Sequence, residues 1–359
     1  MSLLAPLHTL DPERFNTPTI LKQLNVASRN LAELKGLAAA IPNQEILINA
    51  IGLQEAKDSS ALENIVTTHD DLYRESAEES GLNPTAKEVL RYRQALQVGY
   101  RKVQETGLMT LNTVLEIQSV LEAKSAGLRK VPGTTLNDGN GQTIYTPPQD
   151  AREVQRLMGE LESFWHGSPP FEVDPLILMA LIHYQFESIH PFYDGNGRTG
   201  RILNVLYLVK EGLLSTPVLY LSRHIVKTKP TYYRLLQSVR THDAWEEWVL
   251  YMLTGIAVTS AETIHTVRSI SIHLDVMRQE MRAGLKFYTQ DLVNNLFAHP
   301  YTKIDFLVRD LQVSRLTASR YLEAIVEGGW LKKRKIGRSN FYINESLFDI
   351  LRAAENEAL

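Results

Sequence analysis

The sequence predicts a mainly α-helical protein with one small β-hairpin and a separate C-terminal module. Apolar residues recur at helical spacing through most of the first 280 positions, whereas strand signals in that part are largely confined to residues 129–148. From about residue 287 the pattern changes to short helices followed by alternating residues. The 359 residues are enough to bury a sizeable core and to form two or three domains.

The individual elements follow from the same periodicity. Before the hairpin, the pattern predicts helices at residues 20–37, 43–56, 60–75, 85–105 and 110–122. The hairpin itself is predicted around residues 137–141, because Asn-Asp-Gly-Asn-Gly is a strong turn signal between two β-prone runs. Further helices are predicted at residues 174–189, 201–212 and 243–253, followed by a long amphipathic helix to about residue 283.

The composition is that of an ordinary globular protein, and it excludes several kinds of chemistry. Hydrophobic residues make up 44% and charged residues 22%, the formal net charge is −3, and there is no cysteine. Disulfides, thiolate catalysis and cysteine-ligated zinc are therefore excluded, and no global charge recruits nucleic acid or a membrane. Because we find no basic leader and no membrane-length apolar run, we expect a cytoplasmic protein that does not bind membranes.

The most informative segment is His-Pro-Phe-Tyr-Asp-Gly-Asn-Gly-Arg-Thr-Gly-Arg at residues 190–201, which joins two predicted helices. Gly195 and Gly197 let the backbone turn tightly and approach a ligand, and successive amides at a helix N-terminus favour an anion. Asn196 can donate a hydrogen bond to the same anion. Arg198 and Arg201 can clamp phosphate oxygens with the fork geometry of guanidinium groups.

Two other side chains in this segment suit chemistry on a nucleotide phosphate. Asp194 offers a carboxylate of the kind that holds Mg²⁺ together with substrate phosphates. His190 ends the preceding helix and can take up a proton near neutral pH. The segment therefore combines a base, a metal ligand, an anion nest and two arginine clamps.

Two alternative interpretations of the same residues remain open at this point. Gly195-x-Gly197-x-x-Gly200 also matches a dinucleotide fingerprint, which requires a preceding strand where this sequence predicts a helix. His183 and Glu187 share a helix face with His190 and could bind zinc, although no His-Glu-x-x-His signature is present.

Residues 190–201 resemble the signature of the Fic family, His-Pro-Phe-x-Asp/Glu-Gly-Asn-Gly-Arg-x-x-Arg, at every fixed position. The resemblance covers most of residues 25–255 and implies an all-helical core with a β-hairpin flap. The implied activity is transfer of AMP from ATP to a Tyr, Thr or Ser hydroxyl of a target protein and of the protein itself. The resemblance also implies Mg²⁺, or Mn²⁺ in its place, and a homodimer. Removal of AMP, or transfer of another phosphate-containing group, is the alternative within the family.

The resemblance assigns residue roles. His190 is the implied catalytic base and Asp194 the implied metal ligand. The nucleotide-binding residues it implies are Glu63, Val131, Gly195, Asn196, Gly197, Arg198, Thr199, Gly200, Arg201, Tyr232 and Tyr233. The tyrosine pair would pack beside the adenine, with core packing as the other interpretation. Residues 131–135 of the flap would pair with a strand of the target, although Pro132 lacks a backbone donor.

A second motif resembles the inhibitory helix of one class of Fic proteins. Ser59-x-x-x-Glu63-Asn64 matches Ser/Thr-x-x-x-Glu-Gly/Asn upstream of the signature. Glu63 would form a bidentate ion pair with Arg201 and so occupy the group that should orient the γ-phosphate. The alternative is an N-cap serine followed by an ordinary surface glutamate.

The C-terminal pattern resembles a winged helix-turn-helix module. Helices are predicted at residues 289–297, 303–311 and 315–329, and a hairpin around Gly337. Its candidate DNA contacts are Ser314, Arg315, Thr317, Ser319, Arg320, Lys332, Lys333, Arg334, Lys335 and Arg338. Packing on the core or binding a protein is the alternative, and a DNA-binding regulator with a nucleotide-sensing core is the alternative function from a different class.

The predicted domains follow from these segments. They are an N-terminal helical region with the inhibitory helix (1–108), a catalytic core (109–255), a linking helix (256–285) and the winged-helix module (286–359).

Overall fold

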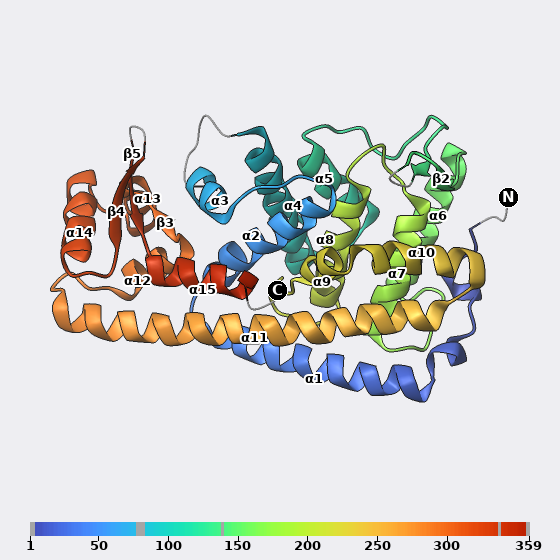
Figure 1. Ribbon diagram of the computed structural model, residues 1–359, viewed down its shortest axis with the longest axis horizontal. Helices are drawn as coiled ribbons and strands as arrows, with labels where there is room; N and C mark the ends of the chain where they lie inside the picture. The colour runs from blue at the N-terminus through green and yellow to red at the C-terminus, as the bar shows by residue number, and fades with distance from the viewer. Residues whose placement is uncertain (1–3, 77–82, 138–139, 337–338, 357–359) are drawn as a thin grey trace.

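The computed structural model describes residues 4–76, 83–137, 140–336 and 339–356. In these residues the chain is mainly helical, with fifteen α-helices and two small antiparallel sheets, which confirms the predicted fold class. Figure 1 shows the helices of the first 250 residues gathered together and the C-terminal module at the opposite end of the molecule. No helix among the described residues is both long and apolar enough to cross a membrane.

The elements up to residue 165 are two short 3-10 helices, six α-helices and the hairpin. They are η1 (Leu7–Thr9), η2 (Pro12–Phe15), α1 (Pro18–Ala40), α2 (Gln44–Leu62), α3 (His69–Ser76), α4 (Pro84–Thr106), α5 (Leu111–Glu122), β1 (Leu136–Asn137), β2 (Thr143–Tyr145) and α6 (Ala151–Trp165). Several begin with a side-chain cap; for example, Thr110 accepts a hydrogen bond from Thr113 N at the start of α5.

The elements after residue 165 are helices up to the C-terminal module, which adds three strands. They are α7 (Pro175–Ile189), α8 (Asn196–Lys210), α9 (Leu221–Lys227), α10 (Lys229–His242), α11 (Trp245–Gly284), α12 (Gln290–Ala298), β3 (Tyr301–Thr302), α13 (Ile304–Leu311), α14 (Arg315–Glu327), β4 (Lys332–Ile336), β5 (Ser339–Ile343) and α15 (Glu345–Asn356).

Helix α2 ends later than predicted, and this shift decides where the second motif lies. The sequence predicts a break between residues 56 and 60, but the helix continues to Leu62. Asn64 has a positive φ of 62° and stops the helix, and Ile65 N bonds back to Ser60 O. Ser59 therefore lies in the last turns of α2 and is fully buried, so its interpretation as an N-cap is wrong.

Helix α8 begins five residues before the predicted start, at Asn196. The second half of the signature is consequently helix rather than turn. Gly195 caps this helix with a φ of +78°, a backbone conformation that favours glycine. The first bond of the helix runs from Thr199 N to Gly195 O, so the helix ladder does not use the amides of residues 196–198.

The two segments predicted on either side of residue 253 form one unbroken helix, α11, of 40 residues. Figure 1 shows α11 running along the whole molecule with α1 beside it, from the helical core to the C-terminal module. Gly255 does not break α11. A Cβ atom there would lie 2.9 Å from side-chain atoms of Leu221 and His224, so glycine lets α9 pack closely against α11.

The flap is smaller than predicted. Strands β1 and β2 pair antiparallel, with Leu136 opposite Tyr145, and residues 138–139 of the predicted turn lie outside the described residues. Residues 131–135, which are predicted to pair with a target strand, are irregular backbone in the chain alone.

The C-terminal module holds α12, α13 and α14 and a three-stranded antiparallel sheet in the order β3-β5-β4. Gly337 and Arg338, at the predicted tip of the wing, lie outside the described residues. Helix α15 was not predicted. It returns to the core, buries Leu347 and Leu351, and its Leu351 O accepts a 2.5 Å hydrogen bond from Gln54 Nε2 of α2.

Candidate nucleotide site

His190 lies where α7 ends, and its backbone holds it in an unusual conformation. Its φ is +50°, and its amide donates to Phe186 O at 3.0 Å. Arg129, which is only 1% exposed, donates from Nε to His190 O at 2.8 Å and from Nη2 to Ile189 O at 3.2 Å. The same guanidinium also bonds Pro148 O behind the flap. Arg129 thus fixes the position of His190, although the sequence analysis gave it no role.

The imidazole of His190 is held in its neutral form. Burial lowers the pKa of His190 to about 4, and the nearby Arg129 contributes to the shift. Its Nδ1 is buried and has no hydrogen-bond partner among the described residues. The ring is therefore neutral at pH 7 and can act as a base once a hydroxyl is brought to it.

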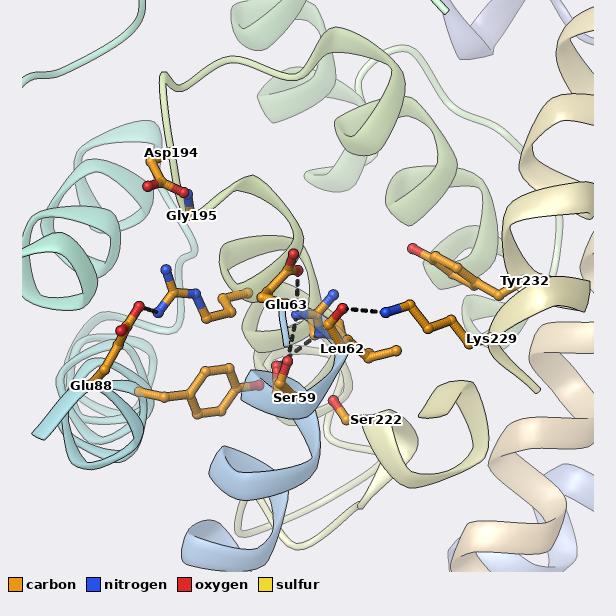
Figure 2. Close-up of polar contacts among 12 residues, drawn as sticks. Ser59, Leu62, Glu63, Glu88, Asp194, Gly195, Ser222, Lys229 and Tyr232 are labelled. Atoms are coloured by element: carbon orange, nitrogen blue, oxygen red, sulfur yellow. Dashed lines mark hydrogen bonds and ion pairs between the residues drawn. The ribbon is translucent and has the colours of Figure 1, made fainter. Parts of the chain in front are cut away.

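Figure 2 shows that Ser59 and Glu63, at the end of α2, lie directly beside the start of α8. Arg201 donates from Nη2 to Glu63 Oε1 at 2.9 Å, and its Nε and Nη2 donate to Ser59 Oγ (2.8 Å) and Ser59 O (2.9 Å). The predicted bidentate pair is therefore a single bond to Glu63, because Ser59 takes the rest of the fork. The arginine side chain is 3% exposed and that of Glu63 is 37% exposed.

Glu63 remains ionised in this arrangement. Burial alone would raise its pKa, but the charge and hydrogen bond of Arg201 outweigh burial and hold the pKa of Glu63 below its usual value. Lys229 adds to the same field, and its Nζ donates to Leu62 O at 2.7 Å at the end of α2 (Figure 2). The carboxylate thus lies at the N-terminus of α8, which we call the mouth of α8. It is a negative charge close to the cations Arg201, Arg198 and Lys229.

Arg198 is also paired, although the sequence analysis foresaw no partner for it. Its Nη1 donates to Glu88 Oε1 of α4 at 2.7 Å and its Nη2 to Glu122 Oε1 of α5 at 2.8 Å. The arginine side chain is only 4% exposed. Figure 2 shows Glu88 approaching from the α4 side of the site. A phosphate group that is to use this guanidinium must therefore share it with two carboxylates.

Each glycine of the signature makes room for a carboxylate. A Cβ atom would lie 2.6 Å from Glu122 Oε1 at Gly195, 2.6 Å from Glu63 Oε1 at Gly197, and 2.6 Å from Glu187 Oε1 at Gly200. Only Gly195 among the three has a positive φ. Gly197 was predicted for its backbone flexibility, but in the structure it leaves space for the ion pair of Glu63 and Arg201.

Asn196 and Asp194 have different roles in the loop. Asn196 Oδ1 accepts from Phe192 N at 2.8 Å and its Nδ2 donates to Phe192 O at 2.9 Å. Its side chain closes the loop, so the predicted donation to phosphate is corrected and only its backbone amide faces the nest. Asp194 is exposed and accepts from Gly195 N at 2.7 Å, while Gln118 Nε2 bonds its carbonyl at 3.3 Å.

The zinc interpretation does not fit the geometry. His183 Nε2 bonds Tyr232 Oη at 2.8 Å, and the His183 ring stacks on Trp248 in the core. Burial raises the pKa of Glu187 to about 7. Within the described ranges, no group of three or more His, Cys, Asp or Glu side chains is placed to hold a metal ion. The helix α7 before the loop likewise leaves no strand for a dinucleotide fold.

Comparison with known proteins assigns the family. Three models match consecutive parts of the chain: the Fic/DOC family N-terminal model at residues 21–101, the Fic/DOC family model at 108–208, and the C-terminal domain of SoFic-like protein adenylyltransferases at 273–347.

The chain belongs to the Fic family.

Curated relatives and solved structures agree with this assignment. Protein adenylyltransferase Fic of Aedes aegypti is 29% identical over 139 residues, and that of Culex quinquefasciatus 33% over 139; each match covers 38% of this chain and 27% of the relative. The matches thus span about a quarter of those proteins. A Fic family protein of Desulfovibrio desulfuricans G20 has the same fold, with a TM-score of 0.60 and 20% identity over 95% of this chain and 98% of that one. Fic-1 of Caenorhabditis elegans (residues 134–508) has a TM-score of 0.55 and 19% identity, over 72% of this chain and 76% of that one.

The tyrosine pair that the Fic resemblance places beside the base divides into two different environments. Tyr232 is 2% exposed and packs in the core with His183 and Trp248. Tyr233 is 41% exposed and lies against Tyr232 with ring centroids 5.2 Å apart. Core packing is therefore the role of Tyr232 in this structure, and Tyr233 is the ring that a nucleotide base could reach.

Three backbone amides of the Fic flap are already bonded within the chain. Tyr193 Oη accepts from Lys130 N at 2.8 Å and from Val131 N at 3.1 Å, although Tyr193 itself is 51% exposed. Gly133 N donates to Gln149 Oε1 at 2.6 Å. A target strand that used Val131 as expected would first have to displace the tyrosine hydroxyl.

The C-terminal cations predicted to contact DNA are partly neutralised within the chain. Arg315 pairs with Asp305, Lys333 with Glu323, and Lys332 with Glu345. Most of these side chains are more than a third exposed, so the pairs contribute little to stability and a phosphate backbone could compete for them. Ser314 is the N-cap of α14 and accepts from Thr317 N at 3.1 Å.

Proposed function

We propose that this protein transfers AMP from ATP to a hydroxyl group of a target protein, and that Glu63 holds the activity down. One observation carries the proposal. A neutral, half-buried imidazole lies at one side of a helix N-terminus, and the arginine on the next turn of that helix is occupied by a carboxylate. The names of the matched relatives, which are protein adenylyltransferases, support the same reaction class.

The transfer needs one proton acceptor and one leaving group. The hydroxyl oxygen of the target attacks the α-phosphorus, its proton passes to His190, and the bond between the α-phosphorus and the bridging oxygen breaks. Pyrophosphate then leaves, while AMP stays on the target. The backbone amides of residues 196–198 are available to the phosphates because the helix ladder does not use them.

The residues present fit a magnesium ion, or Mn²⁺ in its place. Asp194 is exposed next to the anion nest, and Mg²⁺ usually takes one or two carboxylates together with substrate phosphates. Asp194 would hold the ion, which would neutralise charge on the α- and β-phosphates. Gly195 N already bonds one oxygen of this carboxylate and so orients it.

The inhibitory contact of Glu63, which we call the brake, acts on Arg201. With Glu63 in place, the γ-phosphate meets a carboxylate where it needs a guanidinium, so ATP binds with its α-phosphate turned away from in-line attack. A misplacement of about 1 Å costs on the order of a hundredfold in rate. Asn64 matters because its left-handed backbone ends α2 at the point where Glu63 turns toward Arg201.

The experiment that tests the proposal uses ATP labelled at the α-phosphate. The full chain and its Glu63→Gly variant are incubated with labelled ATP and cell lysate, and incorporation into protein is measured. Strong incorporation by Glu63→Gly and weak incorporation by the wild type are expected. Incorporation of label from the γ-phosphate instead would overturn AMP transfer. Release of AMP from labelled product would support the alternative, removal of AMP, in which Glu63 positions a water molecule.

We also propose the domain division at residues 108, 255 and 285, a homodimer, and contact of the C-terminal module with DNA. The boundaries of the matched family models support the first division. Helix α11 runs without a break across residue 255, so the proposed boundary between the core and the linking helix falls within one helix. DNA contact is tested by a mobility shift with genomic fragments at stated salt, using Lys335→Glu and Arg320→Glu as the charge-reversal variants.

A further inference from the structure

A second cavity lies far along the chain from the signature, where the N-terminal helices meet the C-terminal module. Its volume is about 200 Å³. The residues that matter for its chemistry are Tyr73 and Ser76 of α3, Arg93 of α4, His299 after α12, Tyr301 of β3 and Arg309 of α13. The cavity therefore joins elements of two separately matched parts of the chain, residues 21–101 and 273–347.

Arg93 brings a positive charge to this cavity that the described residues do not balance. None of them forms a hydrogen bond or an ion pair with its guanidinium, and its Nε is buried. Burial lowers the pKa of Arg93, but an arginine side chain keeps its proton in proteins. The residue as a whole is half-buried, and a partly desolvated cation without a counter-charge favours an anion beside it.

Tyr73 offers a second donor without a partner. The side chain is 3% exposed, and within the described part of the chain its hydroxyl bonds to nothing. Its ring is held between His69 and Tyr301, with ring centroids 6.0 and 6.3 Å away and nearly parallel planes. The ring is thus fixed by stacking and presents an O–H group beside a guanidinium, two donors that an oxyanion can satisfy together.

The charge of Arg309, which also lines the cavity, is balanced outside it. Asp310 bonds Arg309 at 2.6 Å and lies 3.4 Å from His299 Nε2, so this carboxylate is already paired and does not neutralise Arg93. Burial lowers the pKa of His299, and Arg93 is among the cations that add to this shift. A bound anion would oppose both effects and would let His299 become a further donor.

We propose that this cavity is a binding site for a small oxyanion of the phosphate or carboxylate type, held by Arg93 and Tyr73. Guanidinium groups match both kinds of oxyanion in fork geometry. The volume suits such an ion with a few waters, because a water occupies about 30 Å³. Drug-sized ligands use pockets of about 300–1,000 Å³, so a whole nucleotide is too large. The ion ties α3 and α4 to the C-terminal module.

The test is calorimetric titration of the full chain with inorganic phosphate at constant ionic strength. A non-hydrolysable ATP analogue is kept saturating so that the helix mouth at α8 does not contribute. Arg93→Met is expected to weaken phosphate binding at least about tenfold, and Tyr73→Phe severalfold, because each removes a donor to a charged acceptor. Arg101→Met, an exposed position on the same helix, is the matched control and should leave the affinity unchanged. A parallel titration with acetate distinguishes a carboxylate site from a phosphate site.

Folding of the variants is checked by the melting temperature in anion-free buffer. Arg93→Met should melt no lower than the wild type, because it removes an unpaired, partly desolvated charge. It should also lose the rise in melting temperature that the preferred anion produces. Equal affinity of wild type and Arg93→Met for both anions would overturn the proposal, as would no binding at all.

Glu78 and Glu79 follow α3 in the sequence and lie outside the described residues. A variant without their carboxylates serves as the control for a counter-ion of Arg93 that comes from the chain itself. Binding of phosphate that appears only in the Glu78→Gln, Glu79→Gln double variant would mean that the chain's own carboxylate is the occupant, and would also overturn the proposal. The result does not depend on AMP transfer, because the cavity shares no residue with the nucleotide site.

Discussion

The mouth of α8 contains two buried arginines and the cavity at the C-terminal module a half-buried one, but only the first site supplies its own counter-charges. Arg201 has Glu63 and Arg198 has Glu88 and Glu122, whereas Arg93 has no carboxylate among the described residues. A ligand at the first site must therefore displace or share a carboxylate of the chain. At the second site it would bring the missing charge with it.

The difference shows what the pairing of an arginine within the chain means for a ligand. A paired arginine must give up a carboxylate before it binds an anion, whereas an unpaired one need not. At α8 the bond between Arg201 and Glu63 is largely desolvated on the arginine side, so it is strong enough to compete with a phosphate. A third arrangement lies behind the brake, where the buried carboxyl of Glu55 bonds Tyr92 Oη at 3.0 Å and Ser222 N at 3.2 Å without an ion pair. The predictions below probe these three arrangements.

The largest effect is expected from removal of the base. In a Glu63→Gly background, His190→Ala should lower AMP transfer by about 10²–10⁴-fold, because general base catalysis is worth about that much. ATP affinity, measured by calorimetry, should stay the same. His265→Ala is the matched control, since His265 is exposed on α11 away from the signature. Transfer that survives His190→Ala undiminished would remove the imidazole from the reaction.

Removal of the brake is expected to have the next largest effect. Glu63→Gly should raise transfer by about tenfold to a hundredfold, because Arg201 is then available to align the triphosphate. Glu63→Gln keeps the shape of the side chain and a hydrogen-bonding oxygen but loses the charge. Its rate of transfer should therefore lie between those of the wild type and Glu63→Gly. If all three proteins transferred AMP equally, Arg201 would not be the group that limits the reaction.

The pH dependence of stability tests the buried carboxyl of Glu55, which is 1% exposed. Burial raises its pKa from 4.5 to about 8, partly offset by the hydrogen bond from Ser222. Because the folded state holds the proton more tightly, this group's contribution is complete below pH 4.5 and is lost as the pH rises through 8. Between pH 4.5 and 8 the wild type should lose about 1–3 kcal/mol of its free energy of unfolding through this group, and Glu55→Gln should not show that loss.

Urea unfolding at pH 5, 6.5 and 8 measures this change directly. The slope of stability against pH should be smaller in Glu55→Gln than in the wild type. Parallel curves for the two proteins would mean that Glu55 is ionised in the folded state at neutral pH. Thr113→Val, which alters another buried polar side chain without a titratable group, should leave the slope as it is in the wild type.

The smallest effect is expected at the second partner of Arg198. Glu122→Gln leaves Glu88 in place, so the free energy of unfolding should fall by only about 1–2 kcal/mol, less than for a buried cation that loses its sole partner. Glu116→Gln on the same helix is the control, because its pair with Lys102 is exposed at 3.7 Å and should change stability by less than about 0.5 kcal/mol. Equal losses in both variants would show that Arg198 is not tightly held.

The fold class and the main helices could be predicted because they depend on local periodicity. Helices α4, α5 and α7 lie within two residues of their predicted bounds. Their limits are marked by local signals such as Pro84, Thr110 and Asp174 at the first positions. Errors arose where a tertiary contact overrides the local signal, as at Gly255, whose mid-helix position is compensated by close packing against α9.

The site was predicted as a set of residues but not as a set of partners. The segment at 190–201 is contiguous, so its amides, glycines and arginines could be recognised together. Glu88 lies 110 residues and Glu122 76 residues from Arg198, and nothing in the sequence marks such pairings. Asn196 was assigned to the ligand because an amide suits phosphate, but the same amide bonds the backbone of Phe192 four residues earlier.

Helix α11 has a mechanical consequence. Forty residues at 1.5 Å each make a rod about 60 Å long, and both ends are embedded in folded parts of the chain. The C-terminal module is therefore joined to the core by a rigid helix rather than by a flexible linker. A tilt of about 5° at one end of α11 would displace the other end by about 5 Å. A ligand bound to the module could thus move the helices of the nucleotide site without any change in a loop.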